Sequence, residues 1–375
     1  MKHFIACLSV SVSIAITPVV ACADGPWKRH AIDNRHQGAD GVRLGDFNGD
    51  GLSDVVTGWE ESGLVKLYLN PGPVDSKSAW PATMIGKAKS PEDAVPIDLD
   101  DDGHLDIVSC HEGKQRQVLV HWNDAGTAKW TTDRFGQLDG VMWMFALPLG
   151  KIDTRTALAV GAKGPNASIT LLISPADDSR QLNSWTVIRL RDAGWIMSLR
   201  SIDMDGDGDR DIVFSDRKSN LCVAGWLEQP DDPEGKWNEH QVAAKDKEVM
   251  FLTATKDRWL IAMRESQYLD CRRTNDGWDV VSIDNPPGVI NGKAIEMLPD
   301  GRVIMTANTA ASPNPELPGI WIRDTRGRWS AIDPTPKVKF DRMELIDLDG
   351  DGDLDVMTCE ERQNLGVIWY ENPER

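Results

Sequence analysis

The chain has 375 residues, of which 59 are Asp or Glu and 41 are Lys or Arg, so its formal net charge is −18. This excess of negative charge argues against nucleic acid or an anionic membrane as a partner. The length is sufficient for two ordinary domains or for one large fold built from repeats.

Residues 1–23 have the pattern of a secretory signal. A basic start is followed by an apolar run and by Ala21-Cys22-Ala23, which predicts cleavage after Ala23. The stretch that ends at Cys22 also resembles a lipoprotein signal, in which Cys22 itself would be lipidated. No later stretch is apolar enough to span a bilayer. We therefore expect a protein that is secreted, periplasmic or held at the cell surface, without a transmembrane segment.

A short strand opened by tryptophan recurs along the rest of the chain. It occurs seven times, at spacings of 41 to 55 residues, and its copies start at Trp27, Trp80, Trp130, Trp185, Trp237, Trp278 and Trp329. Between consecutive copies lie three further strand candidates, such as GVRLGDF, DVVTG and LYLNPG after the first copy. A repeat of this length with four short strands predicts the blades of a β-propeller.

An acidic loop follows the first strand candidate in four of the repeats. Oxygen-bearing side chains stand at positions 1, 3, 5 and 9, and the backbone carbonyl of position 7 points the same way. The side chains are Asp46, Asn48, Asp50 and Asp54; Asp98, Asp100, Asp102 and Asp106; Asp203, Asp205, Asp207 and Asp211; Asp347, Asp349, Asp351 and Asp355. The carbonyls belong to Leu52, His104, Asp209 and Asp353. Flexible, all-oxygen cages of this kind prefer Ca²⁺, so the sequence predicts about four calcium sites.

The loops do not fit an EF-hand. That motif needs a bidentate Glu at position 12 and flanking helices, whereas position 12 is Thr57, Ser109, Phe214 or Thr358 and the following residues are typical of strands. The loops instead resemble the FG-GAP (VCBS) repeats of integrin-like β-propellers. The resemblance covers residues 24–375 and implies that each loop joins the first and second strands of a blade.

The predicted fold is therefore all-β: a single seven-bladed β-propeller of four-stranded blades over residues 24–375. The chain opens on a fourth-type strand at Trp27 and ends on a third-type strand, VIWYENPER. The N-terminal strand is thus expected to complete the last blade and close the ring, which leaves no unpaired sheet edge there.

Four cysteines lie in the propeller, which is too few for a disulfide scaffold. Cys222 and Cys271 occupy similar places in consecutive repeats, so one bridge is compatible with the sequence. We expect Cys110, Cys222, Cys271 and Cys359 to be free, buried thiols.

The rim opposite the acidic loops is the expected place for a ligand. Charged or polar residues follow the second strand of every repeat, and basic groups recur there although the chain is acidic. Trp143 and Trp195 belong to no repeated tryptophan position. Aromatic faces beside charged groups suit a sugar, particularly an acidic one. The ligand-binding candidates are Glu60, Lys163, Arg217, Trp143, Trp195, Lys293 and Glu360.

Three classes of function remain open from the sequence. The first is a binding module for carbohydrate, possibly acidic, or for an extracellular protein. The second is a polysaccharide lyase or sugar dehydratase, in which His111 would face Arg264 and Tyr268 across the axis and supply a base. The third is a purely structural or adhesive propeller. In each case we expect a monomer.

Overall fold

The computed structural model describes residues 25–124, 126 and 129–373. The expected signal at residues 1–23, with Cys22, lies outside the described residues. Within the described ranges, no helix is long and apolar enough to cross a membrane.

The described chain forms seven antiparallel sheets of four strands each. The first three complete blades consist of β2 (Ala39–Gly45), β3 (Asp54–Trp59), β4 (Leu64–Tyr68) and β5 (Ala82–Lys87); β6 (Pro91–Ile97), β7 (Asp106–His111), β8 (Val118–Asn123) and β9 (Trp130–Arg134); and β10 (Met142–Ile152), β11 (Arg155–Lys163), β12 (Ser168–Ile173) and β13 (Thr186–Asp192). The next three consist of β14 (Ile196–Ile202), β15 (Asp211–Asp216), β16 (Val223–Glu228) and β17 (Asn238–Ala243); β18 (Val249–Ala254), β19 (Arg258–Met263), β20 (Gln267–Thr274) and β21 (Gly277–Asp284); and β22 (Gly292–Met297), β23 (Val303–Ala307), β24 (Pro318–Arg323) and β25 (Trp329–Pro336). The last blade consists of β26 (Phe340–Ile346), β27 (Asp355–Glu360), β28 (Gly366–Glu371) and β1 (Lys28–Asp33). Three short 3-10 helices lie in connecting segments: η1 (Gly136–Leu138), η2 (Leu182–Ser184) and η3 (Ser219–Leu221).

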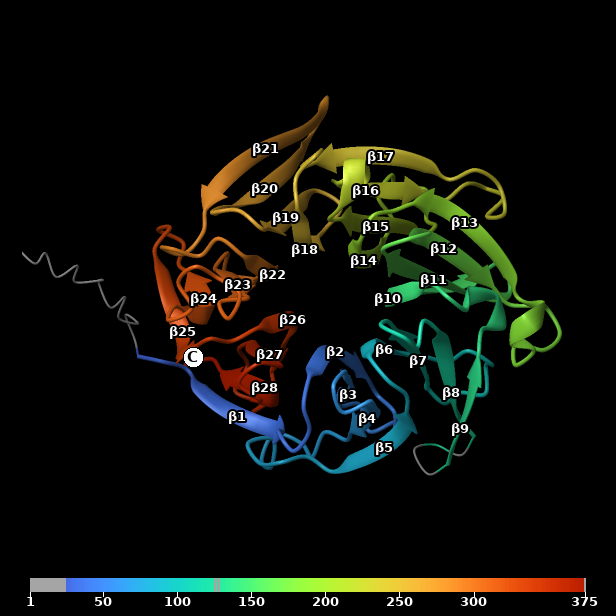
Figure 1. Ribbon diagram of the computed structural model, residues 1–375, viewed down its shortest axis with the longest axis horizontal. Helices are drawn as coiled ribbons and strands as arrows, with labels where there is room; N and C mark the ends of the chain where they lie inside the picture. Colours follow the sequence, from blue (N-terminus) through green and yellow to red (C-terminus); the bar gives the residue numbers. More distant parts are fainter. Residues whose placement is uncertain (1–24, 125, 127–128, 374–375) are drawn as a thin grey trace, which may run out of the picture.

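The sheets stand around a central axis as the blades of a propeller (Figure 1), which confirms the predicted fold class. In each blade the first strand lies nearest the axis and the fourth lies at the periphery. The second strands β3, β7, β15 and β27 are buried along their whole length, because neighbouring blades cover both faces of each sheet. Outer strands such as β9 and β21 are mostly exposed. This gradient places the core between the blades and leaves the axis open to polar side chains.

The last blade takes its outer strand from the N-terminal part of the described chain. β1 runs antiparallel to β28, with Lys28 opposite Glu371 and His30 opposite Trp369. Just before β1, the Trp27 amide donates a hydrogen bond to the carbonyl of Ile332 in the preceding blade (2.9 Å). The two ends of the described chain are therefore held in one sheet.

The acidic loops lie where the resemblance to FG-GAP repeats implied. Each connects the first and second strands of its blade: β2 to β3, β6 to β7, β14 to β15, and β26 to β27. In the other three blades β10–β11, β18–β19 and β22–β23 are joined by short turns. Because all first strands run in the same direction along the axis, the four loops share one rim of the ring.

The four cysteines of the propeller are free and buried, so no bridge joins Cys222 to Cys271. Burial raises the pKa of the Cys271 thiol to about 12, which keeps it protonated. These thiols behave as small apolar groups of the core.

Deletion of β1 is predicted to prevent stable folding. A chain that starts at His36 loses the partner of β28 and exposes a long strand edge, which favours aggregation. A chain that starts at Gly25 keeps β1 and serves as the control. Size-exclusion chromatography and thermal unfolding compare the two. A soluble monomer without residues 25–35 that melts like the control would contradict the prediction.

Candidate functional site

A cavity of about 430 Å³ lies on the axis and is lined by residues from all seven blades. They lie at or just before the starts of the first strands, or at or just after the ends of the second strands, so the cavity opens on the rim opposite the acidic loops. Met144, Phe145, Met197, Met250 and Phe251 form an apolar part of its wall. The charged lining comprises seven carboxylates and six cations: Asp40, Glu60, Glu61, Glu92, Glu112, Asp341 and Glu361, with Lys163, Arg217, Arg264, Lys293, Lys339 and Arg362. The cavity can therefore hold a small, highly polar ligand against an apolar surface.

The structure brings together most of the residues expected on this rim. Glu60, Lys163, Arg217, Trp195 and Lys293 line the cavity. They meet because the starts of the first strands and the ends of the second strands converge toward the axis of the propeller.

Trp143 and Glu360 lie outside the cavity. Trp143 is 2% exposed, packs in the core between blades, and donates its indole N–H to the carbonyl of Leu138 (2.7 Å). Glu360 is fully buried, and its carboxylate accepts backbone N–H groups of the loop that follows it, including those of Arg362 and Gln363 (2.8 and 2.9 Å). Both side chains therefore stabilise the blades rather than facing a ligand.

The three residues proposed for catalysis do not face one another. Only Arg264 lines the cavity. Tyr268 is 1% exposed and packs edge-on against Trp329, with ring centroids 6.2 Å apart. His111 is fully buried, where its Nδ1 contacts the carbonyl of Lys89 (2.9 Å) and its Nε2 contacts the hydroxyl of Ser109 (2.8 Å). The arrangement expected for a lyase base across the axis is not present.

Trp195 organises the cations on one side of the cavity. The charged groups of Lys163, Arg217 and Lys218 lie 4.5, 4.5 and 4.9 Å from the centroid of one of its rings. Such cation–π contacts stabilise positive charge that is partly removed from water. Glu248 contacts both Arg217 and Arg264, at 3.4 and 3.2 Å. This side of the cavity thus offers guanidinium groups held in place by an aromatic ring and one shared carboxylate.

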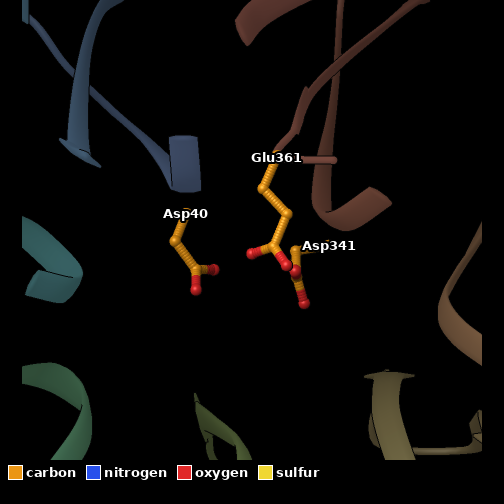
Figure 2. A group of neighbouring side chains, drawn as sticks. All are labelled: Asp40, Asp341 and Glu361. Atoms are coloured by element: carbon orange, nitrogen blue, oxygen red, sulfur yellow. The ribbon is translucent and has the colours of Figure 1, made fainter. Parts of the chain in front are cut away.

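Lys339 and Glu361 form part of the opposite side, and neither was among the candidates chosen from the sequence. Figure 2 shows Glu361, Asp341 and Asp40 converging on the axis. Lys339 lies 2.8 Å from Glu361 and 3.3 Å from Asp341, and Lys293 lies 2.5 Å from Asp341. Burial disfavours the charge of Lys339, but Asp341, Asp40 and Glu361 outweigh it and raise the pKa of the ammonium. The position of Glu361 in the repeat indicates its place on the rim, because it directly follows β27 as Glu60 directly follows β3.

The acidic loops are held in shape by their last aspartate. Asp54, Asp106, Asp211 and Asp355 are each almost completely buried. Each accepts one backbone N–H from position 2 of its own loop and a second from the last residue of the third strand or from one of the two residues after it, at 2.7–3.1 Å. The position-9 side chain therefore ties the loop to the third strand.

The remaining carboxylates of these loops converge. In three loops, carboxylate oxygens of three aspartates lie within 4.8 Å of one another: Asp98, Asp100 and Asp106; Asp203, Asp205 and Asp211; Asp347, Asp349 and Asp351. Buried oxygens of Asp98, Asp100, Asp209 and Asp353 have no hydrogen-bond partner among the described residues. At position 7, the side chains of Asp209 and Asp353 therefore offer oxygens in addition to the expected backbone carbonyl. This donor set fits a hard cation such as Ca²⁺.

The comparisons with known proteins agree with this architecture. Residues 46–109 match the model of the FG-GAP-like repeat family, which confirms the resemblance that the acidic loops suggested. No curated protein sequence matches the chain.

Among solved structures, the fold is similar to that of a catalytically inactive variant of virginiamycin B lyase from Staphylococcus aureus, solved with quinupristin. The identity is 11%, the TM-score is 0.57, and the match covers 92% of this chain and 98% of the lyase. The fold is also similar to that of Sqt1 from Saccharomyces cerevisiae, with 11% identity, a TM-score of 0.53 and coverage of 91% and 97%. At this identity the similarity concerns the fold alone.

His111 is predicted to make stability depend on pH instead of supplying a catalytic base. Burial lowers its pKa from the ordinary 6.5 to about 4. As the pH falls from about 6.5 to 4, the unfolded chain therefore takes up a proton that the folded chain does not, and the stability falls, by about 3 kcal/mol from this residue.

Urea unfolding of the wild type and of His111→Gln at pH 7 and at pH 4.5 tests this expectation. The variant is less stable at pH 7, but it loses less of its stability on acidification. His104→Gln, which replaces an exposed ring, is the control for the substitution of a histidine as such. Parallel pH profiles for wild type and His111→Gln would rule out this role.

Proposed function

We propose that this chain is a calcium-stabilised β-propeller outside the cytoplasm that binds a carbohydrate chain end, with acidic sugars preferred, in its axial cavity. The observation that carries the proposal is the cavity itself. It combines guanidinium groups, carboxylates, an ordered tryptophan and an apolar wall in about 430 Å³.

The polar lining suits a polyhydroxylated ligand. Sugar hydroxyls can donate to carboxylates such as Glu60 and Glu61, while Arg217 and Arg264 can donate two parallel hydrogen bonds to a sugar carboxylate or sulfate. Trp195 supports this role by holding Arg217 in position rather than by offering a bare stacking face, because three cations surround its ring. An extracellular protein remains the other class of partner, and a protruding side chain or chain end would be its contact.

The lyase or dehydratase alternative receives less support. Among the described residues that line the cavity there is no histidine or tyrosine. The base assigned to that chemistry, His111, is buried and bonded to Ser109. Binding is therefore the function that the geometry favours.

The acidic loops on the opposite rim support the calcium part of the proposal. The converging aspartates in the loops repel one another without a cation, and some of their buried oxygens have no hydrogen-bond donor among the residues that the structure describes. Four ions on one rim would fix the strand-one to strand-two connections, and millimolar Ca²⁺ outside the cell is sufficient to fill weak sites.

Removal of calcium is predicted to lower the melting temperature sharply. A ligand present at 100 times its Kd contributes about 2.7 kcal/mol per site to the free energy of unfolding. Differential scanning calorimetry in CaCl₂ and in EDTA measures the effect. Asp351→Ala, in an acidic loop, loses part of the calcium effect, whereas Asp257→Ala, in the short turn of a blade without such a loop, keeps all of it. Identical melting curves in CaCl₂ and EDTA would contradict the calcium sites.

Loss of one arginine from the cavity is predicted to weaken binding of acidic oligosaccharides. Arg264→Ala removes a charged hydrogen-bond donor, so affinity for an oligouronate falls by about 1–3 kcal/mol while the melting temperature stays close to that of the wild type. Trp195→Ala weakens binding similarly because Arg217 loses its support. The exposed Arg326→Ala is the matched control and binds as the wild type does.

Isothermal titration with oligouronates, sulfated oligosaccharides and neutral oligosaccharides provides the measurement. Affinity for the charged ligands decreases with added salt, since exposed charges are screened over roughly 8–10 Å at physiological ionic strength. If the wild type binds none of the three ligand classes, the carbohydrate proposal is refuted and a protein ligand takes its place.

A further inference from the structure

The carboxylates of the axial cavity form two groups that share Asp40. One comprises Asp40, Asp341 and Glu361, and the other comprises Asp40, Glu60 and Glu92. In each group, carboxylate oxygens of the three residues lie within 4.8 Å of one another. The groups differ in how their negative charge is compensated.

The group shown in Figure 2 is largely neutralised by the protein. Asp341 contacts Lys293 and Lys339, and Glu361 contacts Lys339 and Arg362. Three cations thus neutralise two of its three carboxylates, Asp341 and Glu361, and these two need no further positive charge.

The second group lacks such partners. Asp40 is only 8% exposed, yet among the described residues its carboxylate accepts no hydrogen bond and forms no ion pair within 4 Å. The same holds for the half-buried Glu60. Glu92, also 8% exposed, has one distant contact, Lys163 at 3.9 Å, and Lys163 lies much closer to Glu112. Three carboxyl groups therefore converge without a hydrogen-bond donor among the described residues, and the ionisation of all three is unfavourable unless a cation joins them.

Rigid elements hold these side chains in place. Asp40 lies in β2 and Glu92 in β6, the innermost strands of adjacent blades, and Glu60 follows β3 directly. The pairing of both inner strands shifts by a bulge at this point, between Asp40 and Arg43 and between Pro91 and Asp93. Bulges redirect side chains and are common next to functional sites. The backbone N–H of Glu60 also donates to the carbonyl of Gly38 (2.6 Å), which fixes the end of β3 beside the start of β2.

We propose that Asp40, Glu60 and Glu92 bind a hard divalent cation such as Ca²⁺ on the axis of the propeller. The donor set consists only of carboxylate oxygens, without histidine or cysteine, which favours Ca²⁺, Mg²⁺ or Mn²⁺ over Zn²⁺ or Cu²⁺. The charge of the cavity agrees with this choice. Glu248, which contacts Arg217 and Arg264 on the far side, adds an eighth carboxylate to the seven that line the cavity, so eight carboxylates stand against six cations. This site is separate from the four acidic loops, which lie on the opposite rim.

Three protein carboxylates leave coordination positions of a Ca²⁺ ion for other oxygens. The cation would then contact a hydroxyl or carboxylate oxygen of a ligand in the cavity. This consequence rests on the proposed carbohydrate function, whereas the cation site itself does not.

Equilibrium dialysis with ⁴⁵Ca²⁺ on the full propeller tests the site. The wild type binds one more ion per chain than Asp40→Asn and than Glu92→Gln, two nearly isosteric changes that remove a ligand charge. Glu361→Gln is the matched control, because it belongs to the group that lysines neutralise, and it keeps the wild-type stoichiometry. In wild-type crystals soaked in MnCl₂, an anomalous peak appears between Asp40, Glu60 and Glu92.

The proposal is overturned if Asp40→Asn and Glu92→Gln both bind as much Ca²⁺ as the wild type, or if Mn²⁺ gives no anomalous peak between Asp40, Glu60 and Glu92. If Asp40→Asn does not fold, Glu92→Gln and the Mn²⁺ peak in wild-type crystals decide the question. A bound cation without any carbohydrate binding would refute the proposed function alone, and carbohydrate binding without the axial cation would refute this inference alone.

Discussion

The burial of both faces of every blade is the constraint on which the rest of this structure depends. A four-stranded sheet of short strands is stable only when other sheets cover it, and seven such sheets cover one another in a ring. The last sheet is completed by β1, so the ends of the described chain pair in the same blade. The fully buried second strands and the exposed outer strands follow from this arrangement, since burial increases toward the middle of each blade.

The same ring brings seven innermost strands close together, and their polar side chains meet on the axis. Most of the charges there are compensated between blades. Arg43 of β2 pairs with Asp93 of β6 through two hydrogen bonds, and Arg200 of β14 reaches Glu296 of β22. A buried charge without such a partner is costly. Against this background, the carboxylates of Asp40 and Glu60, which have no hydrogen-bond or ion-pair partner within the described part of the chain, are suited to hold a cation from solution.

The two rims have different physical tasks. On one rim the position-9 aspartates accept backbone N–H groups from both sides and fix the hairpins, while the other aspartates converge on a common centre. On the opposite rim the residues that end the second strands face the axis and form a cavity. Calcium on the first rim would stiffen the strands that position the cavity on the second, so the proposed ion sites and the proposed binding site are joined by the first two strands of each blade.

By itself the sequence determined the repeat, the number of blades, the position of the acidic loops and the rim on which polar residues gather. These features follow from local patterns: the spacing of tryptophan-led strands and the alternation of carboxylates in one loop. Only the tertiary structure decided which rim residues face the axis. Glu360 and Glu361 are adjacent, yet the first, at the end of β27, accepts backbone N–H groups of the loop that follows, and the second, just beyond the strand, lines the cavity. Trp143 and Trp195 looked equivalent in the sequence, but one fills the core between two blades and the other supports three cations. The convergence of Asp40, Glu60 and Glu92 likewise depends on two bulges and on the packing of adjacent blades, contacts between distant residues that no local pattern records.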